Sequence, residues 1–271
     1  MTQIAFIGGG NMATAIIGGL LRQGDISAQM VQVSDPGEQQ RQKLAAELGI
    51  QTFADNLEAI ANADTVIMAV KPQMMKEVLA PLKSTLETRQ PLLISIAAGI
   101  SIGNLEAWSG CKAVVRCMPN TPALVGAGAN GLFGNDAVTV DQRNAADRLM
   151  QATGVTVWTK NEAELDVVTA LSGSGPAYYF LLMESMINAA KGMGLSEETA
   201  TSLALQTAFG AGKMAIESDV GPDELRRRVT SPNGTTERAI FTFEGAHMRD
   251  IVAAAMEAAR KRAEELNQEL S

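Results

Sequence analysis

A glycine-rich turn stands at the start of the chain, directly after its first apolar run. Residues 3–7, QIAFI, are typical of a buried strand, and the stretch that follows the turn has the periodicity of a helix. Gly8, Gly10 and Ala13 fit the spacing G-x-G-x-x-G/A. In this pattern the first glycine allows a tight turn, the second lets a pyrophosphate approach the backbone, and the small third residue permits close helix–strand packing. We therefore predict a dinucleotide-binding strand–turn–helix here and disfavour a purely structural turn.

The first part of the chain alternates between strand-like and helical patterns. Short runs rich in Val and Ile occupy 3–7, 30–34, 65–70, 91–97 and 112–118, with further candidates at 129–134 and 154–159. Helical patterns separate most of them, at 12–23, 36–48, 73–87 and about 140–152. Continuous apolar strands between helices predict a parallel sheet that is covered on both faces.

After residue 161 the pattern is helical throughout. Apolar residues recur at helical spacing from Tyr178 to Met193, and Ser196 is placed to cap a helix over 197–217. That second helix is apolar on nearly every side, and a bundle this small cannot bury it alone. We therefore expect an interlocked dimer, with one domain over 1–160 and an all-helical domain over 161–271.

Composition and charge exclude several classes of partner. The formal net charge of the 271 residues is −8, which argues against nucleic acid and anionic membranes as partners. Cys111 and Cys117 show no spacing typical of a metal site or a disulfide framework. No leader segment precedes the first strand, and no apolar run is long enough to span a bilayer. We expect a cytoplasmic protein without a bound metal.

The end of the second predicted strand should decide which dinucleotide binds. Asp35 lies at roughly the distance expected for an acid that accepts a ribose 2′-hydroxyl, which favours NAD. Ser34 could instead bond a 2′-phosphate, and Asn56 could reach the same edge of the adenosine. The nearest arginine is Arg41. These residues leave the choice open.

Three further loops follow predicted strands, at 69–73, 95–100 and 118–126. Ligands of open α/β sheets bind beyond the carboxyl ends of the strands, so these loops should line a nicotinamide pocket. Lys71 is either catalytic or a solvated or phosphate-facing lysine beside a helix-starting proline. Asn120, between two prolines, is either aimed at a ligand or an ordinary loop residue.

A polar stretch, SPNGTTERAI at 231–240, interrupts the helical part. Pro and Gly break helices while Ser, Thr and Asn cap them, so a simple helix–helix loop is one interpretation. The other is a binding loop, because unpaired N–H groups at the helix start would hold an anion.

With these motifs in order, the chain resembles the pyrroline-5-carboxylate reductases, the last enzymes of proline synthesis, over essentially its full length. The resemblance rests on FIGGGNMA (6–13), AVKP (69–72), SIAAGI (95–100), RCMPNTP (116–122), SGSGPAY (172–178) and VTSPNGTTERAI (229–240). The family usually has S-P-G-G-T/A-T at 231–236. Asn233 replaces the first of those glycines here, and asparagine also tolerates a positive φ.

The resemblance implies an N-terminal Rossmann domain and a C-terminal helical dimerisation domain, in dimers that often form decamers of five dimers. It implies reduction of 1-pyrroline-5-carboxylate to L-proline by NADPH, with NADH often accepted more weakly. The resemblance implies that the cofactor is bound by Gly8, Gly10, Asn11, Met12, Ser34, Asn56, Ala69, Val70, Lys71, Pro72 and Ala97. Asp35 is added to this set because of its position after the second predicted strand. The implied substrate-binding residues are Asn120, Ser231, Asn233, Gly234, Thr235 and Thr236, with Thr236 as the catalytic residue.

The chemistry of a cyclic imine fits this set of residues. Hydride goes to a carbon that is electrophilic once the imine is protonated, so alignment with the nicotinamide is the main task. The Thr236 hydroxyl can orient the C=N bond and relay a proton, and Glu237 can complete the helix cap. This agrees with a chain that has one histidine, His247, which we interpret as structural.

Two other functions compete with this interpretation. A β-hydroxyacid dehydrogenase would carry a lysine four residues beyond a G-x-G, but Tyr179 stands four residues after Gly175. A non-catalytic nucleotide sensor would need no anion-binding turn in its helical domain. We further interpret 226–228, RRR, as a solvated face, and 172–178 as a helix-packing segment rather than a pocket lining.

Overall fold

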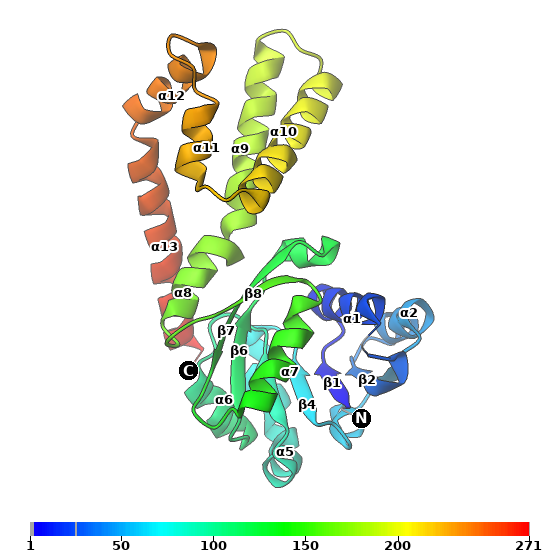
Figure 1. Cartoon of the computed structure of the whole chain (residues 1–271). Helices are drawn as coiled ribbons and strands as arrows, with labels where there is room; N and C mark the ends of the chain where they lie inside the picture. The colour runs from blue at the N-terminus through cyan, green and yellow to red at the C-terminus, as the bar shows by residue number, and fades with distance from the viewer. Residues whose placement is uncertain (1–2, 25, 271) are drawn as a thin grey trace. The chain divides into compact units, whose positions relative to one another are not determined.

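The computed structural model describes residues 3–24 and 26–270. Contacts divide the chain into two compact units (Figure 1). Unit 1 comprises Met1–Ser174 and Ala259–Ser271, and unit 2 comprises Gly175–Ala258. The functional domain limits at 160 and 161 stay a prediction.

Unit 1 is built on one eight-stranded sheet of order β3-β2-β1-β4-β5-β6-β7-β8. The chain order reverses beside β1, which pairs with β2 on one side and with β4 on the other. Such a switch point opens a crevice at the carboxyl ends of the strands, so it positions the glycine turn after β1 for a ligand. The strands are β1 Ile4–Ile7, β2 Val31–Ser34, β3 Gln51–Phe53, β4 Thr65–Met68, β5 Leu92–Ser95, β6 Val114–Met118, β7 Gly128–Gly134 and β8 Gly154–Trp158.

The predicted parallel sheet is confirmed for β1 to β6, whereas the two further strand candidates, β7 and β8, run in the opposite direction. β7 runs antiparallel to β6, with Cys117 opposite Leu132, whereas β8 is parallel to β7. The connection from β6 to β7 contains only the 3-10 helix η4, Thr121–Val125. A parallel return needs a crossover of a dozen residues or more, usually a helix, and this connection is too short.

Helices cover both faces of the sheet, as predicted. One apolar core includes Ile16 of α1, Leu44 of α2 and Leu149 of α7. The other includes Leu79 of α4 and Leu86 of α5. The helices of unit 1 up to Ser174 are α1 Asn11–Gln23, α2 Glu38–Leu48, α3 Asn56–Ile60, α4 Met75–Leu79, α5 Lys83–Arg89, α6 Ile102–Ser109, α7 Val140–Gln151 and α8 Glu164–Val168.

The helical pattern predicted over 73–87 is confirmed, and the structure divides it into consecutive short helices. The segment forms 3-10 helix η2 Pro72–Met74, then α4, 3-10 helix η3 Ala80–Leu82 and α5. Pro81 explains the break, because proline lacks the N–H that a continuous helix needs. Sequence patterns also missed β3 and α3. β3 has three partly exposed residues at the edge of the sheet, and α3 is a short helix capped by Asp55.

Unit 2 is entirely helical, and its helix over 197–217 is confirmed at both ends. Ser196 caps it by accepting a hydrogen bond from the N–H of Thr199, also as predicted. Its helices are α9 Gly175–Gly192, α10 Glu197–Glu217, α11 Pro222–Arg228, α12 Thr235–Gly245 and α13 Met248–Glu269, of which the last ends in unit 1. None of the helices within the described residues has the length and apolar character required to cross a membrane.

Candidate active site

The glycine turn and the loop after β4 lie against each other. Gly8 has a φ of 100°, and a Cβ at this position would lie 2.6 Å from the carbonyl oxygen of Ala69. The N–H of Ala69 donates to the carbonyl oxygen of Ile7 at 2.8 Å. Only glycine fits here, because both the backbone conformation and the contact exclude a side chain. Two of the loops expected to meet at this edge of the sheet therefore do so.

The start of α1 has the features of a pyrophosphate site. Gly10 is its N-cap residue, and no side chain among residues 3–24 and 26–270 caps this end. A Cβ on Gly10 would meet no heavy atom within 4 Å, so the glycine leaves open space in front of the helix. Asn11 and Met12 then offer first-turn N–H groups, which together with the helix dipole favour an anion. These residues fit a dinucleotide.

At the end of β2, the residues expected near the adenosine differ in exposure. The Asp35 carboxylate accepts hydrogen bonds from the N–H groups of Gly9 at 2.9 Å and Gly37 at 2.8 Å. Ser34 is fully buried, and its hydroxyl lies 3.5 Å from the carbonyl oxygen of Phe6. Asn56 is partly exposed as the first residue of α3. Asp35, rather than Ser34, is therefore presented at this edge.

The loop after β4 carries Lys71 on its surface. Lys71 is exposed and immediately precedes Pro72, the first residue of η2. Ala69 and Val70 are partly buried beside the glycine turn. The exposed lysine is compatible with both interpretations, a catalytic and a phosphate-facing one.

Asn120 is almost wholly buried and its amide is committed to the protein. Its Oδ1 accepts from the N–H of Ala129 at 2.9 Å, and its Nδ2 donates to the carbonyl oxygen of Ser172 at 3.0 Å. The side chain is 9% exposed. These bonds join the segment after β6 to the start of β7 and to residue 172, so Asn120 holds this part of unit 1 together. Substrate binding by Asn120 stays a prediction.

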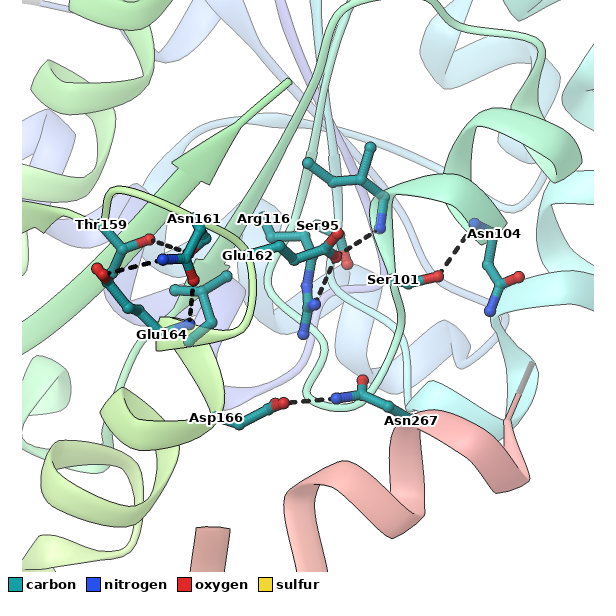
Figure 2. Close-up of polar contacts among 12 residues, drawn as sticks. Ser95, Ser101, Asn104, Arg116, Thr159, Asn161, Glu162, Glu164, Asp166 and Asn267 are labelled. Carbon is teal, nitrogen blue, oxygen red and sulfur yellow. Dashed lines mark hydrogen bonds and ion pairs between the residues drawn. The ribbon is translucent and has the colours of Figure 1, made fainter. Parts of the chain in front are cut away.

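Sequence reasoning missed a buried ion pair that supports the predicted nicotinamide loop (Figure 2). Arg116, in β6, donates from Nη1 to Oε1 of Glu162 at 2.6 Å, and the same oxygen accepts the N–H of Ile102 at 2.7 Å. Arg116 is 6% exposed. The signal available in the sequence was an arginine within the apolar run KAVVRCM, because a buried charge needs a partner. The pair anchors the end of the loop that contains Ala97.

The end of the chain supports the same loop. Asn267, near the end of α13, donates from Nδ2 to Oδ1 of Asp166 at 2.9 Å (Figure 2). A Cβ on Gly99 would lie 3.3 Å from the Cβ of Leu266, so α13 packs closely on this turn. Burial raises the pKa of the Asp166 carboxyl above its ordinary value, against the hydrogen bond from Asn267 and the charge of Arg116, which lower it.

In unit 2, the SPNG stretch forms a tight turn before α12. The N–H of Gly234 donates to the carbonyl oxygen of Ser231 at 3.0 Å, and Asn233 has a φ of 58°. Proline at the second position and a positive φ at the third are the features of a type II turn. Asn233 therefore adopts the positive φ that this turn requires.

The turn delivers the chain to an open helix N-terminus. Gly234 is the N-cap residue of α12 and has no side-chain cap within the part of the chain described here. Glu237 instead accepts the N–H of Asn233 at 2.8 Å, which fixes the turn. The first-turn N–H groups of Thr235 and Thr236 lie beyond it, and Thr236 is partly exposed. The arrangement suits a small anion next to a hydroxyl group.

The remaining candidates are structural. Arg227 and Arg228 pair with Glu224 at 2.6 Å and 2.8 Å, which agrees with a solvated face. His247 is exposed and lies 3.3 Å from Asp250. A Cβ on Gly173 would lie 2.5 Å from Cε of Met118, so the 172–178 segment does pack closely.

Both cysteines are free and buried in unit 1. Burial raises the pKa of the Cys111 thiol to about 11, against a hydrogen bond from Ser109 that lowers it. Burial raises the pKa of the Cys117 thiol as well. Thiols that stay protonated are poor nucleophiles. No cluster of potential metal ligands occurs among the described residues.

Comparison with known proteins gives the same relatives for sequence and structure. Residues 162–266 match the model of pyrroline-5-carboxylate reductase dimerisation, and residues 3–99 match that of NADP oxidoreductase coenzyme F420-dependent. The pyrroline-5-carboxylate reductase of Pseudomonas aeruginosa is 52% identical over 99% of this chain and 98% of its own. The solved pyrroline-5-carboxylate reductase of Coxiella burnetii is 43% identical with a TM-score of 0.93, over 98% of each chain. The pyrroline carboxylate reductase of Plasmodium falciparum, solved with NADP bound, is 30% identical with a TM-score of 0.86, also over 98% of each chain.

Proposed function

This chain belongs to the pyrroline-5-carboxylate reductase family, and we propose that its two units divide the reaction between them. The protein is an oxidoreductase that converts 1-pyrroline-5-carboxylate to L-proline with an NADP-binding domain. In our proposal, the glycine turn and the loops after β2, β4 and β5 in unit 1 hold the cofactor. The 231–237 loop of unit 2 holds the substrate.

The observation that carries the proposal is the open N-terminus of α12 behind the type II turn. The substrate has one carboxylate, and the N–H groups of Thr235 and Thr236 give it an anion site with no competing side-chain cap among residues 26–270. Ser231, Asn233 and Gly234 form the turn that presents this site. Glu237 holds the turn through Asn233, so the site is fixed before substrate binds.

Thr236 is the residue that we assign to the imine. Its hydroxyl orients the C=N bond and passes a proton to the imine nitrogen, while bound NADPH supplies the hydride. Little acid–base machinery is required, because a protonated imine already accepts hydride. Gly8, Gly10, Asn11 and Met12 hold the pyrophosphate in this proposal, and Ala69, Val70, Lys71, Pro72 and Ala97 line the ribose–nicotinamide side.

The experiment that tests this assignment compares Thr236→Ala and Thr236→Ser by steady-state kinetics and by NADPH binding. We expect Thr236→Ala to lower turnover by about 100-fold or more with little change in NADPH affinity, and Thr236→Ser to recover most of the turnover. Equal losses of turnover and NADPH affinity in Thr236→Ala would contradict a substrate role.

We also propose an assembly and a location for the protein. Unit 2 provides a homodimerisation domain. We propose that the dimers can assemble further into a decamer of five dimers in the cytoplasm. The two free cysteines agree with a reducing compartment. Light scattering on the purified chain would test the assembly, and a mass that stays at or below that of a dimer would contradict the decamer.

A further inference from the structure

We propose that Glu162 is a positioning residue for hydride transfer. Its carboxylate fixes the loop at 96–101, which carries Ala97, so that the nicotinamide is held in one orientation for the reaction. The proposal rests on the function proposed above, which places Ala97 on the nicotinamide side of the cofactor. It goes beyond that function by naming a residue outside the proposed cofactor and substrate sites whose loss slows turnover without weakening cofactor binding.

The first step of the argument concerns the two ends of the loop at 96–101. The loop leaves β5 beside β4, because the N–H of Ile96 donates to the carbonyl oxygen of Met68 at 3.2 Å. At its other end, Ser101 is the N-cap residue of α6 and Ile102 is the first residue of that helix. The N–H of a first helical residue has no partner within its own helix. This end of the loop therefore depends on an acceptor from elsewhere in the chain.

The second step is that Glu162 supplies this acceptor and connects it to the other end of the loop (Figure 2). Its Oε1 accepts the N–H of Ile102 at 2.7 Å and Nη1 of Arg116 at 2.6 Å. Arg116 pairs in register with Ser95, the last residue of β5. One carboxylate oxygen thus links the strand position where the loop begins to the helix position where it ends. The Arg116 side chain is 8% exposed, so water competes little for this link.

The third step is that the turn carrying Glu162 is fixed independently of the loop. Glu162 lies between β8 and α8. Its carbonyl oxygen accepts the N–H of Leu165 at 3.0 Å. Just before it, the N–H of Thr159 donates to the carbonyl oxygen of Leu132 in β7 at 2.8 Å. The carboxylate is therefore presented from the sheet, and the loop at 96–101 is positioned against it.

The fourth step concerns the consequence for the reaction. Hydride transfer needs reacting atoms about 3–3.5 Å apart, and a displacement of about 1 Å can lower the rate by about 100-fold. A loop released at Ile102 would allow Ala97 to shift, which would widen the range of orientations open to the nicotinamide. The glycine turn and the start of α1, which hold the pyrophosphate in the proposed site, would be unchanged. The loss should therefore fall on kcat and leave NADPH affinity largely intact.

The test compares three variants of the full-length protein. Glu162→Ala removes both the acceptor and the charge, whereas Glu162→Gln removes the charge and keeps Oε1 as an acceptor for the N–H of Ile102. Asp147→Ala is the matched control, because Asp147 is also a partly buried carboxylate of unit 1. Its Oδ1 accepts the hydroxyl of Thr156 at 2.6 Å and Nε1 of Trp158 at 3.1 Å, between α7 and β8.

Three measurements are made on each variant. Steady-state kinetics with NADPH and 1-pyrroline-5-carboxylate give kcat and KM, and calorimetry gives NADPH affinity. Hydrogen exchange of residues 96–104 in the protein without cofactor reports directly on the loop, so this measurement does not depend on turnover.

We expect Glu162→Ala to lower kcat by about tenfold or more, to keep NADPH affinity within about threefold of the wild type, and to speed exchange at 96–104. Glu162→Gln should recover most of the turnover. Asp147→Ala should lower the melting temperature but leave kcat and exchange at 96–104 unchanged. If Glu162→Ala does not fold, Glu162→Asp provides the measurement, because it keeps the charge and withdraws the oxygens by about 1.5 Å.

Two results would overturn the proposal. One is a kcat within about threefold of the wild type in Glu162→Ala, and the other is an equal loss of turnover and NADPH affinity. A Glu162→Gln variant as slow as Glu162→Ala would also contradict the role of the acceptor. A wild-type chain without turnover would count against the proposed function instead, and faster exchange at 96–104 in Glu162→Ala would still support the positioning of the loop by Glu162.

Discussion

Unit 1 and unit 2 bury their apolar side chains to very different extents. In unit 1, Phe6 and Leu79 are completely buried within cores on the two faces of the sheet. In residues 175–258, all of which the structure describes, Ala200 is the only apolar side chain that is buried as fully. Phe209 is 65% exposed and Ile216 is 86% exposed on the same helix, α10.

This difference shows that the two units solve the burial problem in different ways. Unit 1 covers both faces of its own sheet with its own helices. Unit 2 presents apolar helix faces that only further protein can cover, as a dimerisation domain requires. The helix over 197–217, which the sequence shows to be apolar on nearly every side, therefore lies in the unit that serves an interface.

The largest expected effect comes from placing a charge on an exposed apolar residue in each unit. Phe209→Glu should abolish dimerisation and lower activity by about 100-fold or more, because a carboxylate would be buried without a partner. Val140→Glu is the matched control in unit 1. Val140 is 74% exposed at the start of α7, where a glutamate also favours the helix dipole. Light scattering would measure the dimer and an activity assay the turnover. Equal losses of dimer and activity in the two variants would contradict the difference between unit 1 and unit 2.

Next in size is a pair of glycine substitutions that separates folding from binding within unit 1. Gly8→Ala should destabilise the protein by about 2–3 kcal/mol, because it forces a positive φ and a contact with Ala69. Gly10→Ala should leave the melting temperature unchanged and weaken NADH and NADPH binding by about tenfold, because its methyl group would enter open space at the pyrophosphate site. Thermal unfolding and calorimetry would measure both. A lowered melting temperature of Gly10→Ala would argue against a role of Gly10 in binding alone.

A smaller effect is expected from breaking one ion pair in each unit. Arg116→Met should cost about 2 kcal/mol, since it removes the charged donor from the partly buried carboxylate of Glu162. Arg249→Met, which removes the exposed pair with Glu244, should leave the melting temperature unchanged. Urea unfolding of the two variants decides the matter. Equal losses of unfolding free energy in the two variants would mean that the burial of Arg116 does not strengthen its ion pair.

The smallest effect is a pH dependence at Asp166. Burial raises its pKa in the folded protein, so the folded state binds more protons than the unfolded state above the ordinary value of 3.8. Stability from this group is therefore lost as pH rises from 3.8 through the raised pKa. Asp166→Asn should remove this loss. Its free energy of unfolding should therefore rise relative to that of the wild type between pH 3.8 and the raised pKa, as measured by urea unfolding at several pH values. A difference that is constant with pH would contradict the assignment.

Local signals in the sequence predicted a large part of this architecture. The glycine turn, the start of α1 and both ends of α10 follow from spacing, capping and periodicity within short windows. The overall fold class, an α/β domain followed by helices, was accessible for the same reason. The turn at 231–234 could be recognised because Pro, Asn and Gly specify a turn directly.

Features that depend on distant residues were not accessible. The antiparallel direction of β7 follows from the length of one connection, while its apolar pattern reads the same in either direction. Arg116 and Glu162 are separated by 46 residues, and Asp166 and Asn267 by 101. Nothing in the local pattern around Asn267 indicates a partner so far away. The burial of Ser34 also depends on the packing of β2 against β1, so it could not be predicted from the residues next to it in the sequence.

The return of the chain end to unit 1 has a consequence for synthesis. Leu266 packs on Gly99, Asn267 binds Asp166, and Leu270 joins the core on one face of the sheet. A ribosome adds these residues only after the whole of unit 2, which itself follows the rest of unit 1 along the chain. The turn at 97–102 therefore lacks this support until unit 2 has been synthesised. The core of unit 1 is complete only once the segment beyond unit 2 has been made.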